Sequence, residues 1–151
     1  MRRPLRIFIF CALALFFTAC TADVVPTVKV YKHVDWGCCD TWIDHLRVNG
    51  FSLEPVNVLE PDEYRQRLGI PRELASCHFA EVGDYVVGGH VPAEDINRLL
   101  DERPDALGLA VGGMPAGSPG MEGDRKDPYD VLLLKKDGTS SVFQSYRWST
   151  R

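Results

Sequence analysis

Hydrophobic residues along the chain change their spacing several times, and each change predicts a new element. The alternation at Val28 and Val30 indicates a strand, and the spacing of Trp42, Ile43 and Leu46 indicates one face of a helix. The predicted elements are a strand near 27–33, a helix near 40–49, a strand near 51–58, a helix near 61–68, strands near 76–82 and 85–87, a helix near 92–103, and a hairpin with arms at 131–135 and 141–146.

The order of these elements predicts the fold class. Strands and helices follow one another as β-α-β-α-β-β-α, which is the thioredoxin-like order, so we expect an α/β protein with a central mixed sheet flanked by helices. A loop rich in Gly, Pro and Met follows at 112–123, where neither helix nor strand would be stable. A C-terminal hairpin then turns at Asp137-Gly138. The absence of an internal repeat favours one domain over 27–151.

The first residues carry the pattern of an export signal. A basic start precedes an apolar run at 7–17 that is too short to span a bilayer, and small residues precede Cys20. We predict a signal peptide at 1–19 and a tether at 20–26. The ending Phe17-Thr18-Ala19-Cys20 is similar to a bacterial lipobox, in which Cys20 is lipidated; simple secretion and a retained anchor are the alternatives. Thr21, in place of an aspartate retention signal, favours the outer membrane.

Charge narrows the range of partners. The chain has 17 Lys and Arg against 21 Asp and Glu, a formal charge of −4, and loss of Arg2, Arg3 and Arg6 with the signal lowers it to −7. Such an acidic mature chain argues against nucleic-acid binding. We therefore expect a periplasm-facing protein with no nucleic-acid partner, held at the membrane only through a lipid anchor.

The cysteines are the main candidates for chemistry. Cys11 leaves with the signal and lipidation would occupy Cys20, which leaves Cys38, Cys39 and Cys77. An odd number of thiols in an oxidising compartment leaves one free after a disulfide forms. Adjacent cysteines bond each other only through a strained ring, so their partners lie elsewhere in the chain or in a soft metal ion. A structural Cys39–Cys77 disulfide is the alternative to a metal site.

The thioredoxin-like order brings these thiols together. Cys38 and Cys39 follow the first strand, at a helix N-terminus that lowers a thiol pKa. The start of the third strand, Ser76-Cys77-His78, lies alongside that position in such a fold. Three thiols and the imidazole of His78 are therefore expected to converge, a donor set that suits copper, above all Cu(I). The alternative for His78 is an ordinary strand histidine.

Two methionines and three further histidines are candidates for additional ligands. Met114 and Met121 bracket the Gly/Pro loop, and their thioethers would add a preference for Cu(I), although methionine also fills gaps in cores. We expect His45 to be an exposed or partly packed helix residue and His90 to lie in a turn that caps the third helix. His33, next to the cysteine loop, is left open.

Several short motifs match a known family. They are Tyr31-Lys32, Gly37-Cys38-Cys39, Trp42, His45-Leu46, Asn49-Gly50-Phe51, Ser76-Cys77-His78, Gly89-His90-Val91-Pro92, and the loop from Gly113 to Glu122. With these motifs the sequence resembles the CopG-like copper-resistance proteins, small exported metal-binding proteins that are unrelated to the ribbon-helix-helix repressors of the same name. The resemblance covers about Val28 to Phe143, and the long Met-Pro-Gly-Ser loop makes it specific.

The resemblance implies a thioredoxin-like fold, copper binding through thiolates and a role in periplasmic copper handling, with redox chemistry on copper left open. Members usually read Cys-Gly-Cys-Cys, whereas the first of these positions is Trp36 here. The change removes the C-x-x-C spacing and argues against a standard disulfide reductase. A three-sulfur Cu(I) site from Cys38, Cys39 and Cys77 is still expected. Compensation for the missing cysteine by His33 or Asp35 is left open.

Three hypotheses about function follow. The first is that the protein sequesters Cu(I), or transfers it to other copper-handling proteins of the cell envelope, through Cys38, Cys39 and Cys77, with Met114 and His78 as helpers. The alternative is a thiol-disulfide or copper-redox oxidoreductase in which Cys39 attacks and Cys77 resolves. The third is a family member whose fold survives as an interaction module.

Overall fold

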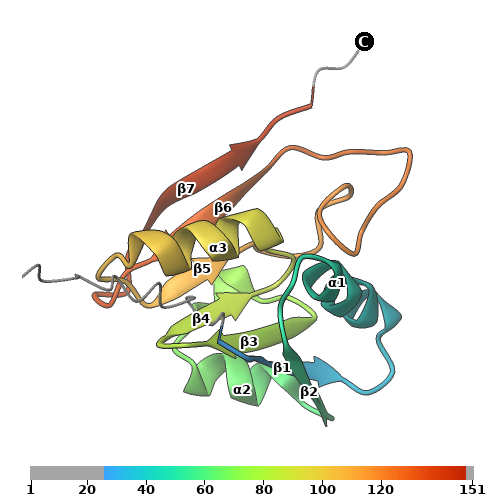
Figure 1. Ribbon diagram of the computed structural model, residues 1–151, viewed down its shortest axis with the longest axis horizontal. Helices are drawn as coiled ribbons and strands as arrows, with labels where there is room; N and C mark the ends of the chain where they lie inside the picture. Colours follow the sequence, from blue (N-terminus) through green and yellow to red (C-terminus); the bar gives the residue numbers. More distant parts are fainter. Residues whose placement is uncertain (1–25, 149–151) are drawn as a thin grey trace, which may run out of the picture.

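The computed structural model describes residues 26–148, so the predicted signal peptide at 1–19 and the lipidation site Cys20 lie outside the described residues. The described part contains a mixed sheet with the strand order β2-β1-β3-β4-β5-β6-β7 (Figure 1). Its strands are β1 (Val28–His33), β2 (Leu53–Val58), β3 (His78–Val82), β4 (Tyr85–Gly88), β5 (Gly108–Ala110), β6 (Tyr129–Leu134) and β7 (Ser140–Tyr146). The helices are α1 (Gly37–Val48), α2 (Pro61–Arg67) and α3 (Ala93–Glu102), with a 3₁₀ turn, η1, at Arg72–Leu74.

The strand pairing confirms the predicted mixed sheet. β1 is parallel to β2 and antiparallel to β3, β4 is antiparallel to β3 and parallel to β5, and β5, β6 and β7 are antiparallel neighbours. The chain order β1-α1-β2-α2-β3-β4-α3 is the one predicted from the sequence, and it agrees with a thioredoxin-like arrangement. The predicted α/β fold, Gly/Pro/Met loop and C-terminal hairpin are all present.

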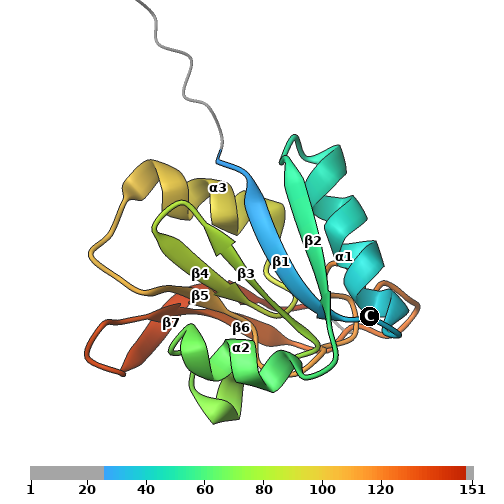
Figure 2. The same ribbon diagram turned by 90° about the horizontal axis from the view of Figure 1, so that it is seen from below.

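Different helices cover the two faces of the sheet. α1 and α3 lie on one face and α2 lies on the other (Figure 2). Val28 and Val30 pack in the larger core with Trp42 of α1 and Ile96 of α3. Tyr31 points the other way, into the smaller core on the α2 side, because successive side chains of a strand face opposite sides of the sheet.

The start of α1 differs from the prediction. The helix begins at Gly37, three residues before Asp40, and no side chain caps it. Trp36 is the N-cap with an extended backbone (φ −98°, ψ 103°), and its carbonyl accepts a hydrogen bond from the amide of Cys39 at 3.3 Å. The predicted start was wrong because a backbone bond closes the first turn without the expected side-chain cap. Both Cys38 and Cys39 therefore lie inside that turn.

β5 was absent from the prediction. It has three residues, too few to display a period, and it exists because β4 and β6 pair with it on either side. At Gly108 a Cβ atom would lie 1.9 Å from the carbonyl oxygen of Val86. The close pairing of β4 and β5 therefore requires glycine at this position.

The loop at 112–123 folds back onto α1. The amide of Gly117 donates to the carbonyl of Met121 at 2.7 Å, and the fully buried Ser118 hydroxyl donates to the carbonyl of Pro115 at 2.7 Å. Gly120 has a φ of +85°, and a Cβ there would lie 2.9 Å from the amide nitrogen of Trp42. The loop is thus an ordered layer against the first turns of α1.

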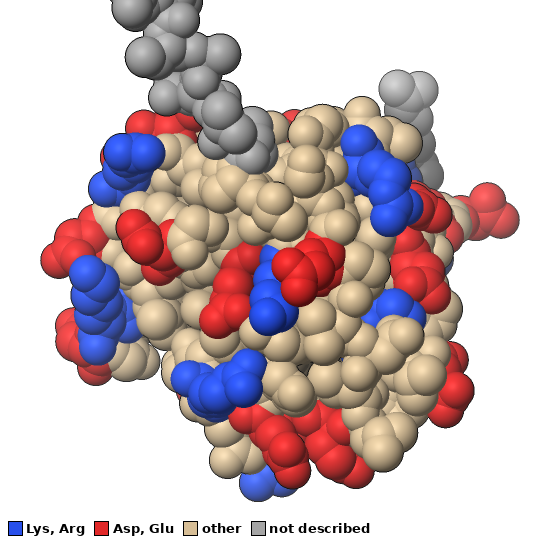
Figure 3. Space-filling view, turned by 60° about the horizontal axis from the view of Figure 1, so that its bottom comes forward, with Lys and Arg blue, Asp and Glu red and all other residues tan. Residues whose placement is uncertain are grey.

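The surface of the described part bears on membrane and nucleic-acid binding. Among the described residues, no helix combines the length and apolar character needed to cross a bilayer. On the face in Figure 3, lysine and arginine side chains are interspersed with aspartate and glutamate. That face carries no continuous basic patch.

Candidate metal centre

Two of the three thiols are presented by the first turn of α1. Cys39 is buried, whereas Cys38 is partly exposed. The helix points its unpaired backbone N–H groups and the positive end of its dipole toward this turn, so negative charge on sulfur is stabilised there. Of these two thiols, the partly exposed Cys38 is the one that solvent reaches.

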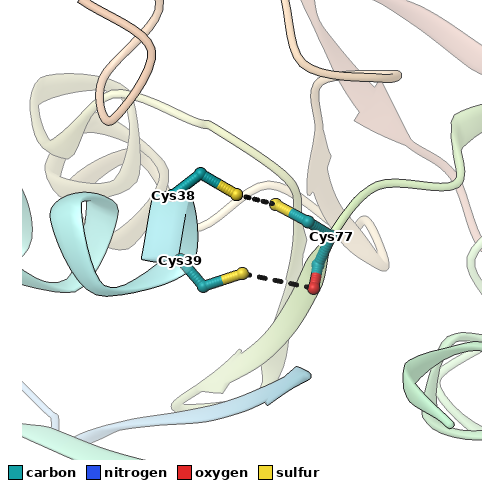
Figure 4. Close-up of side chains that lie close together, drawn as sticks. All are labelled: Cys38, Cys39 and Cys77. Atoms are coloured by element: carbon teal, nitrogen blue, oxygen red, sulfur yellow. Dashed lines mark hydrogen bonds between the residues drawn. The ribbon is translucent and has the colours of Figure 1, made fainter. Parts of the chain in front are cut away.

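The third thiol, Cys77, comes from the start of the strand next to β1. Cys77 directly precedes β3, and β3 pairs with β1 so that His78 lies opposite Lys32, close to where the chain leaves β1 for α1. The sulfur of Cys77 lies 3.5 Å from that of Cys38, and the thiol of Cys39 donates to the carbonyl of Cys77 at 3.4 Å (Figure 4). All three are free thiols, so the alternative of a Cys39–Cys77 disulfide is not present.

Two imidazoles complete the cluster around Cys77. Nδ1 of His78 lies 3.2 Å from the Cys77 sulfur, and Nε2 of His90 lies 3.1 Å from the same atom. Both histidines are fully buried. The Cys77 sulfur is therefore the meeting point of thiols from α1 and imidazoles from the two ends of the β3–β4 hairpin.

Hydrogen bonds on the far side of each ring fix its tautomer. Nε2 of His78 bonds the carbonyl of Gly89 at 3.0 Å, and Nδ1 of His90 bonds the carbonyl of Pro119 at 2.8 Å. A carbonyl oxygen only accepts, so these nitrogens carry the protons of the neutral rings. The nitrogens that face Cys77 are then left with lone pairs. A proton on the Cys77 sulfur satisfies at most one of them and a thiolate satisfies neither, so the cluster is short of positive charge.

The aromatic surroundings hold this arrangement in place. The indole ring of Trp42 packs against the imidazole of His78 with ring centroids 4.2 Å apart, and its Nε1–H donates to the carbonyl of Val91 at 2.9 Å. Gly89 has a φ of +69°, and a Cβ there would lie 2.4 Å from the carbonyl oxygen of Val111. A glycine is thus needed to bring the acceptor carbonyl to His78.

The surroundings of the three thiols shift their pKa values in different directions. The hydrogen bond from the Cys39 thiol is the largest cause that lowers the pKa of Cys77, against the effect of burial. Burial raises the pKa of Cys38, and the hydrogen bond to Cys77 followed by burial raises that of Cys39. Burial also lowers the pKa of His78. Cys77 is accordingly the thiol of the set that gives up its proton first, while Cys38 and Cys39 keep theirs.

The donor geometry fits a soft metal ion. In two groups, Cys38 with Cys39 and Cys77, and Cys77 with His78 and His90, the ligand atoms lie within 4.8 Å of one another. Two sulfurs at about 2.3 Å from one ion lie at most roughly 4.6 Å apart, so the 3.5 Å between Cys38 and Cys77 is compatible with a shared ion. Thiolate and imidazole donors suit copper and zinc.

The structure brings some predicted site residues together and leaves others apart. Cys38, Cys39, Cys77 and His78 converge as expected. The backbone next to Met114 is tied to the segment before Cys77, since the Gly113 amide donates to the Ala75 carbonyl at 3.1 Å, but the Met114 side chain is half exposed. Met121 is partly buried in the loop. Metal ligation by either methionine remains a prediction.

The prediction for His90 was wrong, whereas His45 is a partly packed helix residue, as expected. His90 does not cap α3 but lies buried on Cys77, and His45 takes the capping role, because its Nε2 accepts a hydrogen bond from the Ala93 amide at 3.1 Å. The hairpin register pairs Phe79 with Gly88, which places the residues just outside it together. A hairpin register of this kind, inferred from the sequence, would have indicated that His90 lies close to Cys77.

His33 lies outside both donor groups. Its ring stacks on that of Trp36 with centroids 4.8 Å apart, and its Nδ1 accepts a hydrogen bond from the amide of Asp35 at 3.1 Å. Trp36 itself is 45% exposed. Position 36, where members of the CopG-like family usually have their first cysteine, therefore holds a partly exposed tryptophan that stacks on His33 at the edge of the site.

Comparison with known proteins settles the family. A family model described as a protein of unknown function, DUF411, matches residues 74–121. A solved structure described as "Copper resistance protein copG- Form 2" shares 42% identity, covers 82% of this chain and 100% of its own, and superimposes with a TM-score of 0.78. The chain belongs to the CopG family of copper resistance proteins.

A second CopG structure, Form 1, gives 43% identity over 82% of this chain and 98% of its own, with a TM-score of 0.77. No curated protein matches the chain. The CopG resemblance drawn from the sequence is thus confirmed, as is the α/β fold. Together with the Cys/His cluster, membership of the CopG family supports a copper-related function.

Proposed function

We propose that this protein is an exported, periplasm-facing copper protein that sequesters Cu(I) or passes it on, with Cys38, Cys39 and Cys77 as the principal ligands. The observation that carries the proposal is the convergence of sulfur and imidazole lone pairs on the Cys77 position without enough protons to satisfy them. A metal cation relieves that shortage. Cu(I) prefers thiolate and imidazole donors to the carboxylates found elsewhere on the surface.

The accessibility of the thiols suggests how copper enters. Cys38 is partly exposed, while Cys39, Cys77 and both histidines are buried. Copper from solvent or from another copper-handling protein of the envelope meets Cys38 first and then the buried donors. Binding displaces the protons of Cys38 and Cys39, and the half-exposed thioether of Met114 is a further candidate ligand.

The cellular location is part of the same proposal. The signal at 1–19 directs export, and lipidation of Cys20 anchors the protein to the outer membrane facing the periplasm. Metabolic labelling with a lipid precursor tests the anchor in wild type and in a Cys20→Ala variant. Label that is equal in both proteins would contradict it.

Copper binding is tested by competition. Reduced mature protein is titrated anaerobically with Cu(I) against a chelator of known affinity, in wild type and in the Cys38→Ser/Cys39→Ser double variant. The matched control is His33→Gln, whose ring stacks on Trp36 outside both donor groups. We expect the double variant to lose tight binding and the control to keep it. Equal affinity in wild type and the double variant would rule out the proposal.

The oxidoreductase alternative is favoured by one contact, the 3.5 Å between the sulfurs of Cys38 and Cys77. A disulfide needs the sulfurs at about 2.05 Å, which is a small approach from that distance. Cys38 is thus a resolving partner to consider beside the Cys39–Cys77 pair predicted from sequence. Mass mapping after graded oxidation tests it, and the absence of any disulfide to Cys77 would exclude this alternative.

A further inference from the structure

An open pocket of about 250 Å³ lies beside the 112–123 loop, which contributes Gly117, Pro119 and Glu122 to its lining. It is located at the start of α3, between α1, the loop and the β6–β7 hairpin. Its lining residues that carry polar or aromatic side chains are His45, Asn49, Glu94, Glu122, Tyr129, Tyr146 and Trp148. None of the donors around Cys77 lines it, so the two regions have separate chemistry.

The charge of this pocket is negative. Glu94 and Glu122 line it, and no lysine or arginine does. The Glu94 carboxylate accepts a hydrogen bond from the Tyr146 hydroxyl at 2.6 Å, and that of Glu122 accepts one from the Gly120 amide at 2.9 Å. Burial lowers the pKa of His45, so its imidazole adds no positive charge at neutral pH. Two carboxylates therefore face the pocket with hydrogen bonds but without a cation among its lining residues.

Aromatic rings form another part of the pocket lining. Tyr129 and Tyr146 stack with centroids 4.8 Å apart at an interplanar angle of 15°, and Trp148 lies 6.4 Å from Tyr146. Tyr129 is only 8% exposed, and its hydroxyl has no hydrogen-bond partner within the described part of the chain. The ammonium of Lys126 already lies 4.4 Å from the centroid of the Trp148 ring. The rim thus attracts a cation of the chain itself, as aromatic faces do.

These features select the class of ligand. We propose that the pocket binds an alkylammonium or guanidinium group, the head group of lysine and arginine side chains and of free polyamines. The carboxylates pair with its charge, the rings contact its methylene groups, and the volume suits one such group. A metal ion is disfavoured, because His45, Glu94 and Glu122 are not among the described groups whose ligand atoms lie within 4.8 Å of one another.

The test uses copper-free mature protein, so its result does not depend on the copper proposal. Binding of N-acetyl-arginine methylamide and of putrescine is measured by calorimetry and by tyrosine and tryptophan fluorescence. The uncharged control ligand is N-acetyl-citrulline methylamide, which has nearly the same shape as the arginine compound. We expect saturable binding of a cation and about 10-fold weaker binding of citrulline, the effect of roughly 1.4 kcal/mol for a charge-assisted contact.

Variants locate the binding. Glu94→Gln and Glu122→Gln are each expected to weaken binding of the cation several-fold, while Glu102→Gln, on the same helix as Glu94 but outside the pocket, leaves it unchanged. Because Glu122 lies on an exposed part of the loop, its variant carries the test if Glu94→Gln fails to fold. If only N-acetyl-arginine methylamide binds, the natural ligand is the side chain of a protein. If only putrescine binds, the natural ligand is a free amine. Equal binding of citrulline, or unchanged binding in both variants, overturns the proposal.

Discussion

The metal centre and the pocket at the start of α3 share one wall but differ in every other respect. The 112–123 loop contributes the Pro119 carbonyl to His90, and it contributes Glu122 and Pro119 to the pocket lining. The metal centre is buried and built from soft donors, whereas the pocket is open and built from carboxylates and aromatic rings. One ordered loop can thus separate a site of soft ligands from a site of hard ligands over a short distance.

Each region also contains a histidine whose partners explain its role. His78 directs a lone pair at Cys77 because its other nitrogen donates to a carbonyl, so its free nitrogen is available for metal binding. The Nε2 atom of His45 accepts a hydrogen bond from the Ala93 amide, so His45 stabilises the start of α3. The same residue type is a candidate ligand in one region and a helix cap in the other because of the hydrogen bond it makes.

The largest effect is expected from Cys77→Ser, which removes the atom common to both donor groups. The affinity for Cu(I) should fall by more than the roughly 10- to 100-fold loss typical of residues that only support a ligand. Binding of arginine amide to the pocket should be unchanged. Competition titration and calorimetry on the same preparation check both halves. A copper affinity within about 10-fold of wild type, on the scale of that supporting role, would contradict the central role of Cys77.

His90→Gln should produce the next largest effect, a loss of about 10- to 100-fold in Cu(I) affinity, whether His90 binds copper itself or only positions the Cys77 thiolate. The change removes a lone pair aimed at Cys77 and the bond to the Pro119 carbonyl. His33→Gln is the matched control, with unchanged affinity expected. A loss of equal size in both variants would mean that the effect comes from the fold and not from the site.

Gly120→Ala should disturb both regions at once. Its φ of +85° and the 2.9 Å that would separate an alanine Cβ from the Trp42 amide nitrogen force the loop away from α1, at a cost of about 1–3 kcal/mol in the free energy of unfolding. Urea unfolding measures this cost. Gly123→Ala is the control, since no atom lies within 4 Å of its Cβ position and its φ is not positive. Equal stability of the two variants would show that the loop does not depend on this contact.

The smallest effect concerns pH. Burial lowers the pKa of both His45 and His78 below the ordinary 6.5, so the unfolded chain binds more protons and the copper-free protein should lose stability as the pH falls below about 6.5. Urea unfolding between about pH 7.5 and 5 measures the slope. His45→Gln keeps an acceptor for the Ala93 amide and should reduce the slope without abolishing it. A slope unchanged by this variant would assign the acid sensitivity to the metal centre alone.

Much of the fold and part of the site could be predicted from local pattern. The alternation at Val28 and Val30 and the helical spacing of Trp42 and Leu46 report on single elements, and their order restricts the ways in which the sheet can be built. A sheet built from that order of elements places β1 next to β3. The approach of Cys77 to Cys38 could therefore be predicted from the sequence as well.

The tertiary structure alone decided the rest, since it depends on contacts between distant segments. β5 exists only between β4 and β6, and the roles of His45 and His90 depend on bonds to Ala93 and to Pro119, which lie 48 and 29 residues away. The sequence by itself determined which residues can bind a soft metal. Only packing determined which lone pairs face Cys77, because a histidine's hydrogen-bond partner, and not its place in the chain, sets the direction of its free nitrogen.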